Sequence, residues 1–190
     1  MVRSLVTDGI DLSTVRPPDG IRMMPWASGL LRDHGKVKYE SFRNEMDASV
    51  FACLGQRDGC IRLMKDLAGR TDFVPQATWL VLGPYGPGGK SVPIGTIQGL
   101  RMDAAKESDQ IRLMEGPQGS IQNVGIIPGC RGMGLGRVLL AYGLAGFQEA
   151  GCRSVSLEVT SHNTAAIRLY LSMRFSIAET VYKVADVPIA

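Results

Sequence analysis

The chain has 190 residues, of which 45% are hydrophobic and 21% charged, and its formal net charge at pH 7 is +3. This length suits one well-packed domain and is too short for two ordinary ones. Charges of both signs are spread evenly along the chain, which argues against a disordered protein and against a nucleic-acid-binding protein. We therefore predict a single domain over residues 1–190, with residues 1–20 as a candidate loosely ordered extension.

Cysteines, long apolar segments and histidines, which indicate a cell compartment or a metal site, are few in this sequence. The four cysteines form no CxxC pair, which is typical of reduced intracellular thiols. Asp8, Asp11 and Pro17 interrupt any apolar stretch near the N-terminus, and no later apolar run reaches membrane-spanning length. His34 and His162 are the only histidines, without a third ligand at metal-binding spacing. We expect a cytoplasmic protein that binds neither a membrane nor a metal ion.

The N-terminal half begins with short elements. A turn cluster of Pro and Gly at residues 17–20 precedes an apolar run, which predicts a strand over residues 21–26. Between residues 39 and 69, apolar side chains recur at helical spacing with a break near Gly59. We predict two consecutive helices in this region.

The middle of the chain predicts a hairpin. Strand patterns cover residues 78–82 and 92–102, and a loop rich in Gly and Pro joins them. Within this loop Gly89, Lys90 and Ser91 imitate the end of a Walker A phosphate loop. However, the first required glycine is absent and a strand follows instead of a helix. We interpret these residues as the tip of the hairpin.

The C-terminal half alternates between strand and helix patterns. A strand over residues 120–127 leads through a glycine-rich turn into a helix that begins at Leu135. A strand pattern over residues 155–159, a helix over 166–173 and a last strand near 180–184 follow. Strands first in a meander and then interleaved with helices predict an α/β domain with a mixed sheet covered on both faces.

The glycine-rich turn is the most informative motif. The glycines at 132, 134 and 136 alternate between a strand and a helix. Such a turn can aim several backbone amides at one point, and the helix adds unpaired N–H groups and the positive end of its dipole. This combination binds phosphate. A dinucleotide fingerprint is excluded because its third glycine would fall on Arg137.

Two sequence blocks resemble the GNAT acyltransferase superfamily. RGMGLG at residues 131–136 is similar to its Q/R-x-x-G-x-G/A pyrophosphate loop, and LEVTSHNTAAIRLY at 157–170 is similar to its next strand and helix. The resemblance covers about a third of the chain and its pattern is closest to ribosomal-protein N-terminal acetyltransferases. It implies a GNAT-like, mostly antiparallel sheet and acetyl transfer from acetyl-CoA to an amine, by direct attack in a ternary complex. Arg174 departs from the family pattern, which has a helix-capping glycine there.

The resemblance also implies which residues hold the cofactor. Backbone groups near Val124 and Ile126 would face the pantetheine arm, and Asn163 would touch the cofactor. The pyrophosphate would lie on the loop formed by Arg131, Gly132, Met133, Gly134, Leu135 and Gly136.

Glu158 and Tyr170 are the candidate catalytic residues. In a sheet covered on both faces, the carboxylate of Glu158 is expected to be paired, buried or lining the substrate cleft, and burial would raise its pKa. The resemblance places Glu158 where related enzymes have a general base. A structural carboxylate is the alternative. Tyr170 lies at the position of a general acid that would protonate the leaving thiolate, and the alternative is a core tyrosine at helical spacing. We expect the oxyanion donor to be the backbone N–H near Ile126.

The sequence leaves alternatives for the identity of the amine acceptor and for the choice between an enzyme and a binding module. The amine could belong to a protein N-terminus, a small polyamine or an aminoglycoside-like molecule, and a homodimer is an open alternative. The rival function is a non-catalytic CoA-binding sensor or interaction module, whose mark would be loss of both Glu158 and Tyr170. A Cys130 nucleophile paired with His162 is disfavoured because no orienting Asp or Asn is implied.

Overall fold

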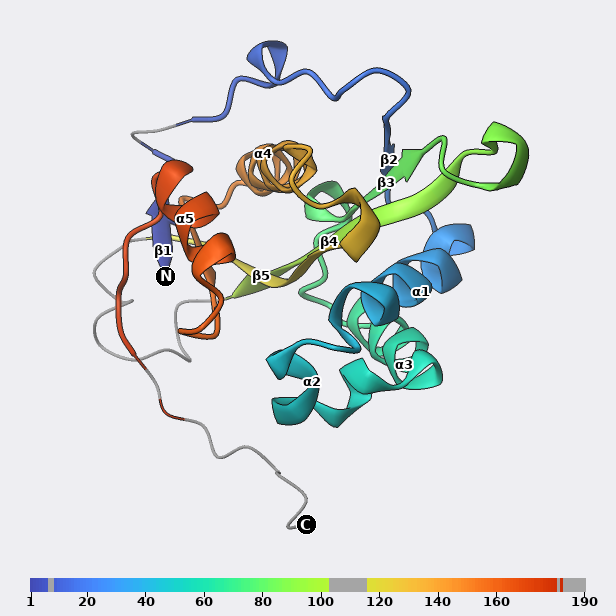
Figure 1. The fold of residues 1–190 in the computed structure, drawn as a ribbon. Coiled ribbons are helices and arrows are strands. Elements are labelled where there is room, and N and C mark those ends of the chain that lie inside the picture. The colour runs from blue at the N-terminus through green and yellow to red at the C-terminus, as the bar shows by residue number, and fades with distance from the viewer. Residues whose placement is uncertain (7–8, 103–115, 181, 183–190) are drawn as a thin grey trace.

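A six-stranded β-sheet organises the part of the chain that the computed structural model describes, residues 1–6, 9–102, 116–180 and 182 (Figure 1). The strands are β1 (Val2–Ser4), β2 (Arg22–Pro25), β3 (Trp79–Gly83), β4 (Val92–Met102), β5 (Gln118–Ile126) and β6 (Ser154–Leu157). They lie in the order β1-β6-β5-β4-β3-β2. Only the pairing of β5 with β6 is parallel. The sheet is therefore mostly antiparallel, as predicted.

Helices cover both faces of this sheet. The α-helices are α1 (Leu31–Phe42), α2 (Met46–Val50), α3 (Arg57–Ala68), α4 (Leu135–Glu149) and α5 (Thr164–Ser172). Helices α1 and α3 lie on one face, whereas α4 covers the other and α5 lies near β1 (Figure 1). None of these helices has both the length and the apolar composition needed to cross a membrane. The predicted fold class is confirmed.

Most of the predicted elements are present within a few residues of their expected bounds. Strand β2, the hairpin of β3 and β4, strand β5 and helices α4 and α5 all follow the apolar patterns. Gly89, Lys90 and Ser91 lie between β3 and β4, which confirms a hairpin tip in place of a nucleotide loop. Strand β6 ends at Leu157, two residues before the alternating pattern does.

The prediction of two helices with a break at Gly59 is wrong. Helix α1 begins at Leu31, well before the expected start, and Gly59 lies inside α3. The glycines in these helices mark close contacts. A Cβ added to Gly35 would lie 2.7 Å from the Cα of Ile61, and one added to Gly59 would lie 2.7 Å from the carbonyl oxygen of Cys53. The glycines allow close packing, whereas a single sequence makes them look like helix breakers.

The two ends of the chain differ from the expectation in different ways. Within the candidate N-terminal extension, β1 forms an edge strand that pairs with β6 from Val2↔Ser156 to Ser4↔Ser154. No periodicity predicts three residues at a sheet edge. The last expected strand, near residues 180–184, lies mostly outside the described residues.

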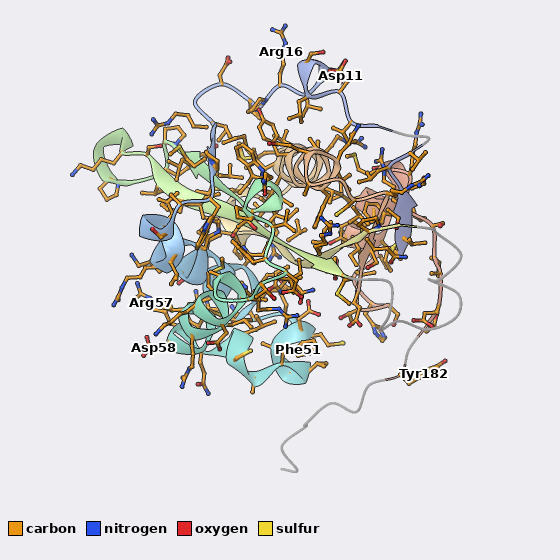
Figure 2. The ribbon with its side chains drawn as sticks, turned by 180° about the vertical axis from the view of Figure 1, so that it is seen from behind. Asp11, Arg16, Phe51, Arg57, Asp58 and Tyr182 are labelled. Carbon is orange, nitrogen blue, oxygen red and sulfur yellow. The ribbon has the colours of Figure 1, made fainter. Side chains whose placement is uncertain are left out.

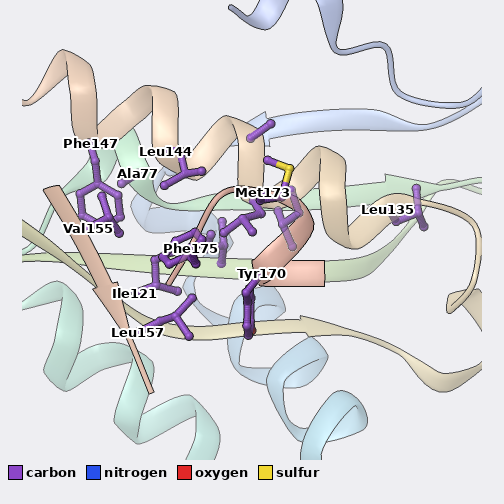
Figure 3. Close-up of a cluster of buried hydrophobic side chains, with 14 of the residues drawn as sticks. Ala77, Ile121, Leu135, Leu144, Phe147, Val155, Leu157, Tyr170, Met173 and Phe175 are labelled. Atoms are coloured by element: carbon purple, nitrogen blue, oxygen red, sulfur yellow. The ribbon is translucent and has the colours of Figure 1, made fainter. Parts of the chain in front are cut away.

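One buried apolar cluster joins the helices of the C-terminal half to the sheet (Figure 3). Phe147 from α4 is fully buried, and Ile121 and Leu157 contribute from the neighbouring strands β5 and β6. Phe175 and Tyr170 add aromatic rings whose centroids lie 5.8 Å apart. Burying one large apolar side chain contributes roughly 2 kcal/mol to the stability of the fold. The cluster therefore fixes α4 and α5 relative to the two strands.

Just beyond the end of helix α5, Arg174 stands where the GNAT pattern has a helix-capping glycine. Arg174 has φ +63°, the left-handed region that glycine would occupy without strain. Its N–H donates to Leu171 O at 3.0 Å, and the N–H of Phe175 donates to Tyr170 O at 3.0 Å. The helix end is thus kept without the glycine, at a cost of about 1 kcal/mol.

Polar groups are buried between α1 and the sheet. His34 Nδ1 lies 2.7 Å from Thr96 Oγ1, and Gln98 donates to the same hydroxyl. Burial, with the charge of Lys38, lowers the pKa of His34 to about 3, so the imidazole is neutral. Lys38 is fully buried, and its Nζ has no hydrogen-bond partner among the described residues. Burial lowers the pKa of Lys38 to about 8. A cation in this place destabilises the fold at neutral pH.

The substitution Lys38→Met should stabilise the protein. At pH 7 both the folded and unfolded chains hold the Lys38 proton, so removal of the buried cation should raise the free energy of unfolding by up to about 3 kcal/mol. Between about pH 8 and 10.5 only the unfolded chain keeps this proton. Wild-type stability should therefore rise with pH relative to the variant across that window. Urea unfolding at several pH values measures both effects.

Lys36→Met on the same helix is the matched control. Lys36 is exposed and pairs with Asp33 at 3.2 Å, so its loss should change stability by less than about 1 kcal/mol. A Lys38→Met variant that is less stable than wild type at pH 7 would contradict the cost assigned to the buried ammonium.

Candidate functional site

The candidate site begins where two parallel strands separate. Pairing between β5 and β6 runs from Gln118↔Ser154 to Ile121↔Leu157 and stops there, although β5 continues to Ile126. A β-bulge lies at the same place, because Gln98 of β4 pairs with Asn123 and the next residue pairs with Ile121. Bulges increase local twist, which turns β5 away from β6.

Separation exposes one edge of β5. Within the described part of the chain, residues 122–126 have β4 as a neighbour on one side and no strand on the other. Val124 and Ile126, the residues expected to face pantetheine, lie in this stretch and are partly buried. Backbone groups at such an edge can pair with an extended ligand as with another strand.

The glycine loop follows β5 after a short 3-10 turn, Pro128–Cys130, and ends at the first turn of α4. Gly132 and Gly134 have φ values of +78° and +76°, which require glycine for an unstrained turn. Gly134 precedes α4, and no side chain caps this helix end. A Cβ built at either glycine meets nothing within 4 Å, so the space before the loop is open. The turn fits a phosphate group.

Other expected loop residues have side chains that point elsewhere. Leu135 is 1% exposed and belongs to the apolar core, so only its backbone can face a ligand. Met133 is exposed, and the hydroxyl of Tyr85 donates to its sulfur at 3.6 Å. Tyr85 comes from the β3–β4 hairpin, so the hairpin tip lies beside the loop.

Arg131 connects the loop to the segment between α1 and α2. Its guanidinium donates to Ser41 O at 2.9 Å and to Ile126 O at 3.1 Å, and it pairs with Glu45 Oε1 at 2.7 Å. In this conformation the side chain fixes the loop against α1. A role as a phosphate ligand rests on its backbone or on exchange of these partners.

Asn163 caps helix α5. Its Oδ1 accepts a hydrogen bond from the N–H of Ala166 at 3.1 Å, a geometry that N-capping residues adopt. The side chain is exposed. Its structural role is therefore established, and contact with a cofactor stays a proposal.

Glu158 is exposed, which excludes burial among the three environments expected for its carboxylate. The reason is that β6 ends at Leu157, and Glu158 lies beyond the covered part of the sheet. Its charge acts on the N-terminal amine of Met1, which donates to Leu157 O at 2.8 Å. Burial lowers the pKa of that amine, and the Glu158 carboxylate opposes the shift.

Tyr170 is 7% exposed and packs in the apolar cluster between α5 and the sheet (Figure 3). Burial, together with the negative charge of Asp47, raises the pKa of Tyr170 to about 12. The phenol therefore stays protonated over the physiological pH range and can act as a hydrogen-bond donor. Full proton transfer from it to a thiolate is strongly uphill.

Sequence reasoning missed the polar residues around α2. Asp47 lies in the first turn of α2 and accepts a hydrogen bond from Thr160 Oγ1 at 2.8 Å, across 113 residues of sequence. Glu45, just before α2, binds Arg131. No motif or periodicity distinguishes these acids from solvated surface residues, so only the tertiary structure reveals them.

Comparison with known families gives one match over most of the chain. Residues 52–175 match the model of the family described as the acetyltransferase (GNAT) family. Among curated relatives, a mycothiol acetyltransferase from Frankia casuarinae is 37% identical over 84 residues, and one from Thermobispora bispora is 42% identical over 82 residues. Each alignment covers 43% of this chain, but only 24% and 27% of the respective relative. The aligned part thus spans about a quarter of their length.

Solved structures share the fold at low sequence identity. The aminoglycoside N-acetyltransferase AAC(6')-Iy in complex with CoA has a TM-score of 0.65 at 13% identity, and the alignment covers 90% of this chain and 99% of that one. Arabidopsis thaliana NAA60 in complex with acetyl-CoA has a TM-score of 0.61 at 23% identity, with 82% and 84% covered. These likenesses show that the same architecture recurs.

We predict that Gly134→Ala weakens acetyl-CoA binding at least about tenfold, equivalent to 1.4 kcal/mol. The added methyl group would enter the open space before the loop, and the positive φ would be strained by about 1 kcal/mol. Gly151→Ala is the matched control, because Gly151 has φ +77° and equally open surroundings but follows the far end of α4. Calorimetric titration of both folded variants measures the affinity. Equal affinities would contradict the assignment of the loop.

Proposed function

The chain belongs to the acetyltransferase (GNAT) family, and from this premise we propose that it transfers the acetyl group of acetyl-CoA to a primary amine by direct attack in a ternary complex. One observation carries the proposal. The free edge of β5 leads, through one short 3-10 turn, into a glycine loop and a helix N-terminus without a side-chain cap. An amide-containing arm and a pyrophosphate joined end to end, as in CoA, need these two surfaces in this order.

The cofactor side of the site is formed mostly by backbone. Groups of Val124 and Ile126 pair with the pantetheine arm, and the amides from Gly132 to Gly136 hold the pyrophosphate. Asn163, at the start of α5, approaches the cofactor from the opposite side while it caps the helix. When bound, acetyl-CoA supplies an activated acetyl thioester and a thiolate leaving group. The backbone N–H near Ile126 donates to the carbonyl oxygen of that thioester.

The chemical steps need an acceptor for the amine proton and a donor to the sulfur. Glu158 takes the amine proton, directly or through water, because it follows β6 at the mouth between the strands and is open to solvent. Tyr170 donates a hydrogen bond to the sulfur as the C–S bond breaks and the C–N bond forms. Its raised pKa makes this a stabilising contact more than a complete proton transfer.

The enzyme reading is favoured over a non-catalytic CoA-binding module. Such a module needs the β5 edge and the loop but has no use for Glu158 and Tyr170, both of which this chain contains. We propose that the reaction takes place in the cytoplasm, where the four cysteines, all free thiols, would stay reduced. An acceptor of the protein α-amine, polyamine or aminosugar class fits the proposal.

Thiol release from acetyl-CoA tests the proposed function. The purified protein should release CoA thiol at a rate that depends on the concentration of at least one amine in a panel. Suitable amines are 2-phenylethylamine, spermidine, glucosamine and a short peptide with a free N-terminus. Mass spectrometry should show one added acetyl group on that amine. Tight acetyl-CoA binding without amine-dependent release would favour the sensor function instead.

The substitution Tyr170→Phe separates a catalytic tyrosine from a core tyrosine. The ring and its burial are kept, so stability should change by no more than about 1.5 kcal/mol. If the hydroxyl contacts the departing sulfur, kcat should fall about ten- to a hundredfold while KM for the amine stays nearly constant. Steady-state kinetics and a thermal melt decide the matter. Normal turnover per folded molecule would make Tyr170 a packing residue only.

A further inference from the structure

Helix α2 and the residue before it bridge the opening between β5 and β6. On one side, Glu45 pairs with Arg131, which follows the end of β5, at 2.7 Å. On the other side, Asp47 accepts a hydrogen bond from Thr160, which follows the end of β6, at 2.8 Å. The two contacts hold one short segment of chain against both sides of the strand opening. Figure 1 places α2 on the α1 and α3 side of the sheet, opposite α4.

The two acids of this bridge differ in how their charges are compensated. Glu45 faces the guanidinium of Arg131, so its charge is neutralised locally. Asp47 bonds to the neutral hydroxyl of Thr160, and within the described residues it takes part in no ion pair. The bridge therefore presents one uncompensated carboxylate, and it is only partly exposed to solvent.

The hydrogen bond from Thr160 places this carboxylate beside the segment that follows β6, two residues after Glu158. Together with the pairing of Glu45 and Arg131, this contact holds Asp47 at the strand opening, where the acetyl group must be held if the proposed function is correct. The negative charge of Asp47 also acts on the buried phenol of Tyr170, in agreement with this placement.

We propose that Asp47 is the specificity-determining residue that receives the acceptor amine in its cationic, ammonium form. This inference rests on the proposed function for the reaction, but it concerns recognition of the acceptor alone. A primary aliphatic amine is protonated near pH 7, since its pKa is close to that of lysine. An ammonium placed against Asp47 satisfies the uncompensated carboxylate and brings the nitrogen to the strand opening, where it loses one proton to solvent before attack and the second to Glu158 as the amide forms. The acceptor class is thus a cationic primary amine, whereas neutral and anionic nucleophiles are disfavoured.

Direct binding of amines to the CoA-saturated protein tests this role without any turnover. We would titrate the panel of amines into wild type and into Asp47→Asn by calorimetry, at low and at moderate salt. Wild type should bind at least one amine, and Asp47→Asn should bind it at least about tenfold more weakly. The affinity of wild type should also fall with added salt more steeply than that of the variant, because salt screens the lost charge pair.

Three further variants separate charge recognition from other effects. Asp58→Asn removes the same charge from the exposed surface of α3, where the side chain points to solvent (Figure 2), and should leave amine affinity unchanged. Thr160→Val removes the hydrogen bond but keeps the carboxylate, so affinity should change less than about threefold. Glu158→Gln, at the proposed base, should lower kcat and leave the amine affinity near that of wild type.

The outcomes distinguish this inference from the proposed function. If Asp47→Asn is folded and binds the amine as tightly as wild type, or if wild type binds no amine, Asp47 does not recognise the acceptor. If wild type binds an amine through Asp47 but releases no thiol from acetyl-CoA, the recognition role stands and the proposed reaction fails.

Discussion

The separation of β5 from β6 after four residue pairs is the constraint on which the rest of the site depends. Two parallel strands that stay paired leave no free backbone between them. Here the bulge opposite Gln98 twists β5 away, and the apolar cluster around Phe147 holds both strands together before that point. The opening is thus defined at one end by packing and at the other by the glycine loop. Under the proposed function, a bound cofactor, the tyrosine of α5 and the acids of α2 meet at this opening.

The parts of the fold that could be predicted from the sequence are those with local causes. The β3–β4 hairpin, β5 and α4 follow from apolar periodicity, and the phosphate loop follows from glycines that need positive φ at 132 and 134. The helix boundaries around Gly35 and Gly59 could not be predicted, because those glycines serve contacts with residues distant in the sequence or in another element. The edge strand β1 has three residues and no pattern, since its pairing with β6 and with Ser176, both distant in the sequence, determines it.

The candidate site divides in the same way. The local backbone at the proposed cofactor-binding positions Val124 and Gly134 could be predicted, because strand, turn and helix occur in a recognisable order along the chain. The surroundings of the side chains could not be predicted from the sequence. Burial was one of the environments expected for Glu158, but the residue lies past the end of β6 and is exposed. The importance of Asp47 depends on Thr160 and Tyr170, more than a hundred residues away, and no local pattern encodes such a juxtaposition.

The charge of Asp47 also links acceptor recognition to the chemistry at Tyr170. In the absence of an acceptor, burial and this carboxylate both keep the phenol a very weak acid. An ammonium bound at Asp47 would cancel the contribution of the carboxylate, while the contribution of burial would remain. The hydroxyl of Tyr170 would then become a better donor to sulfur at the moment when the acceptor is in place. Arg131 has a parallel role on the other side, because its pairing with Glu45 and Ser41 O ties the phosphate loop to the same bridge. One short segment thus has polar contacts both to the loop after β5 and to the turn after β6, the two sides on which the proposed cofactor and acceptor would lie.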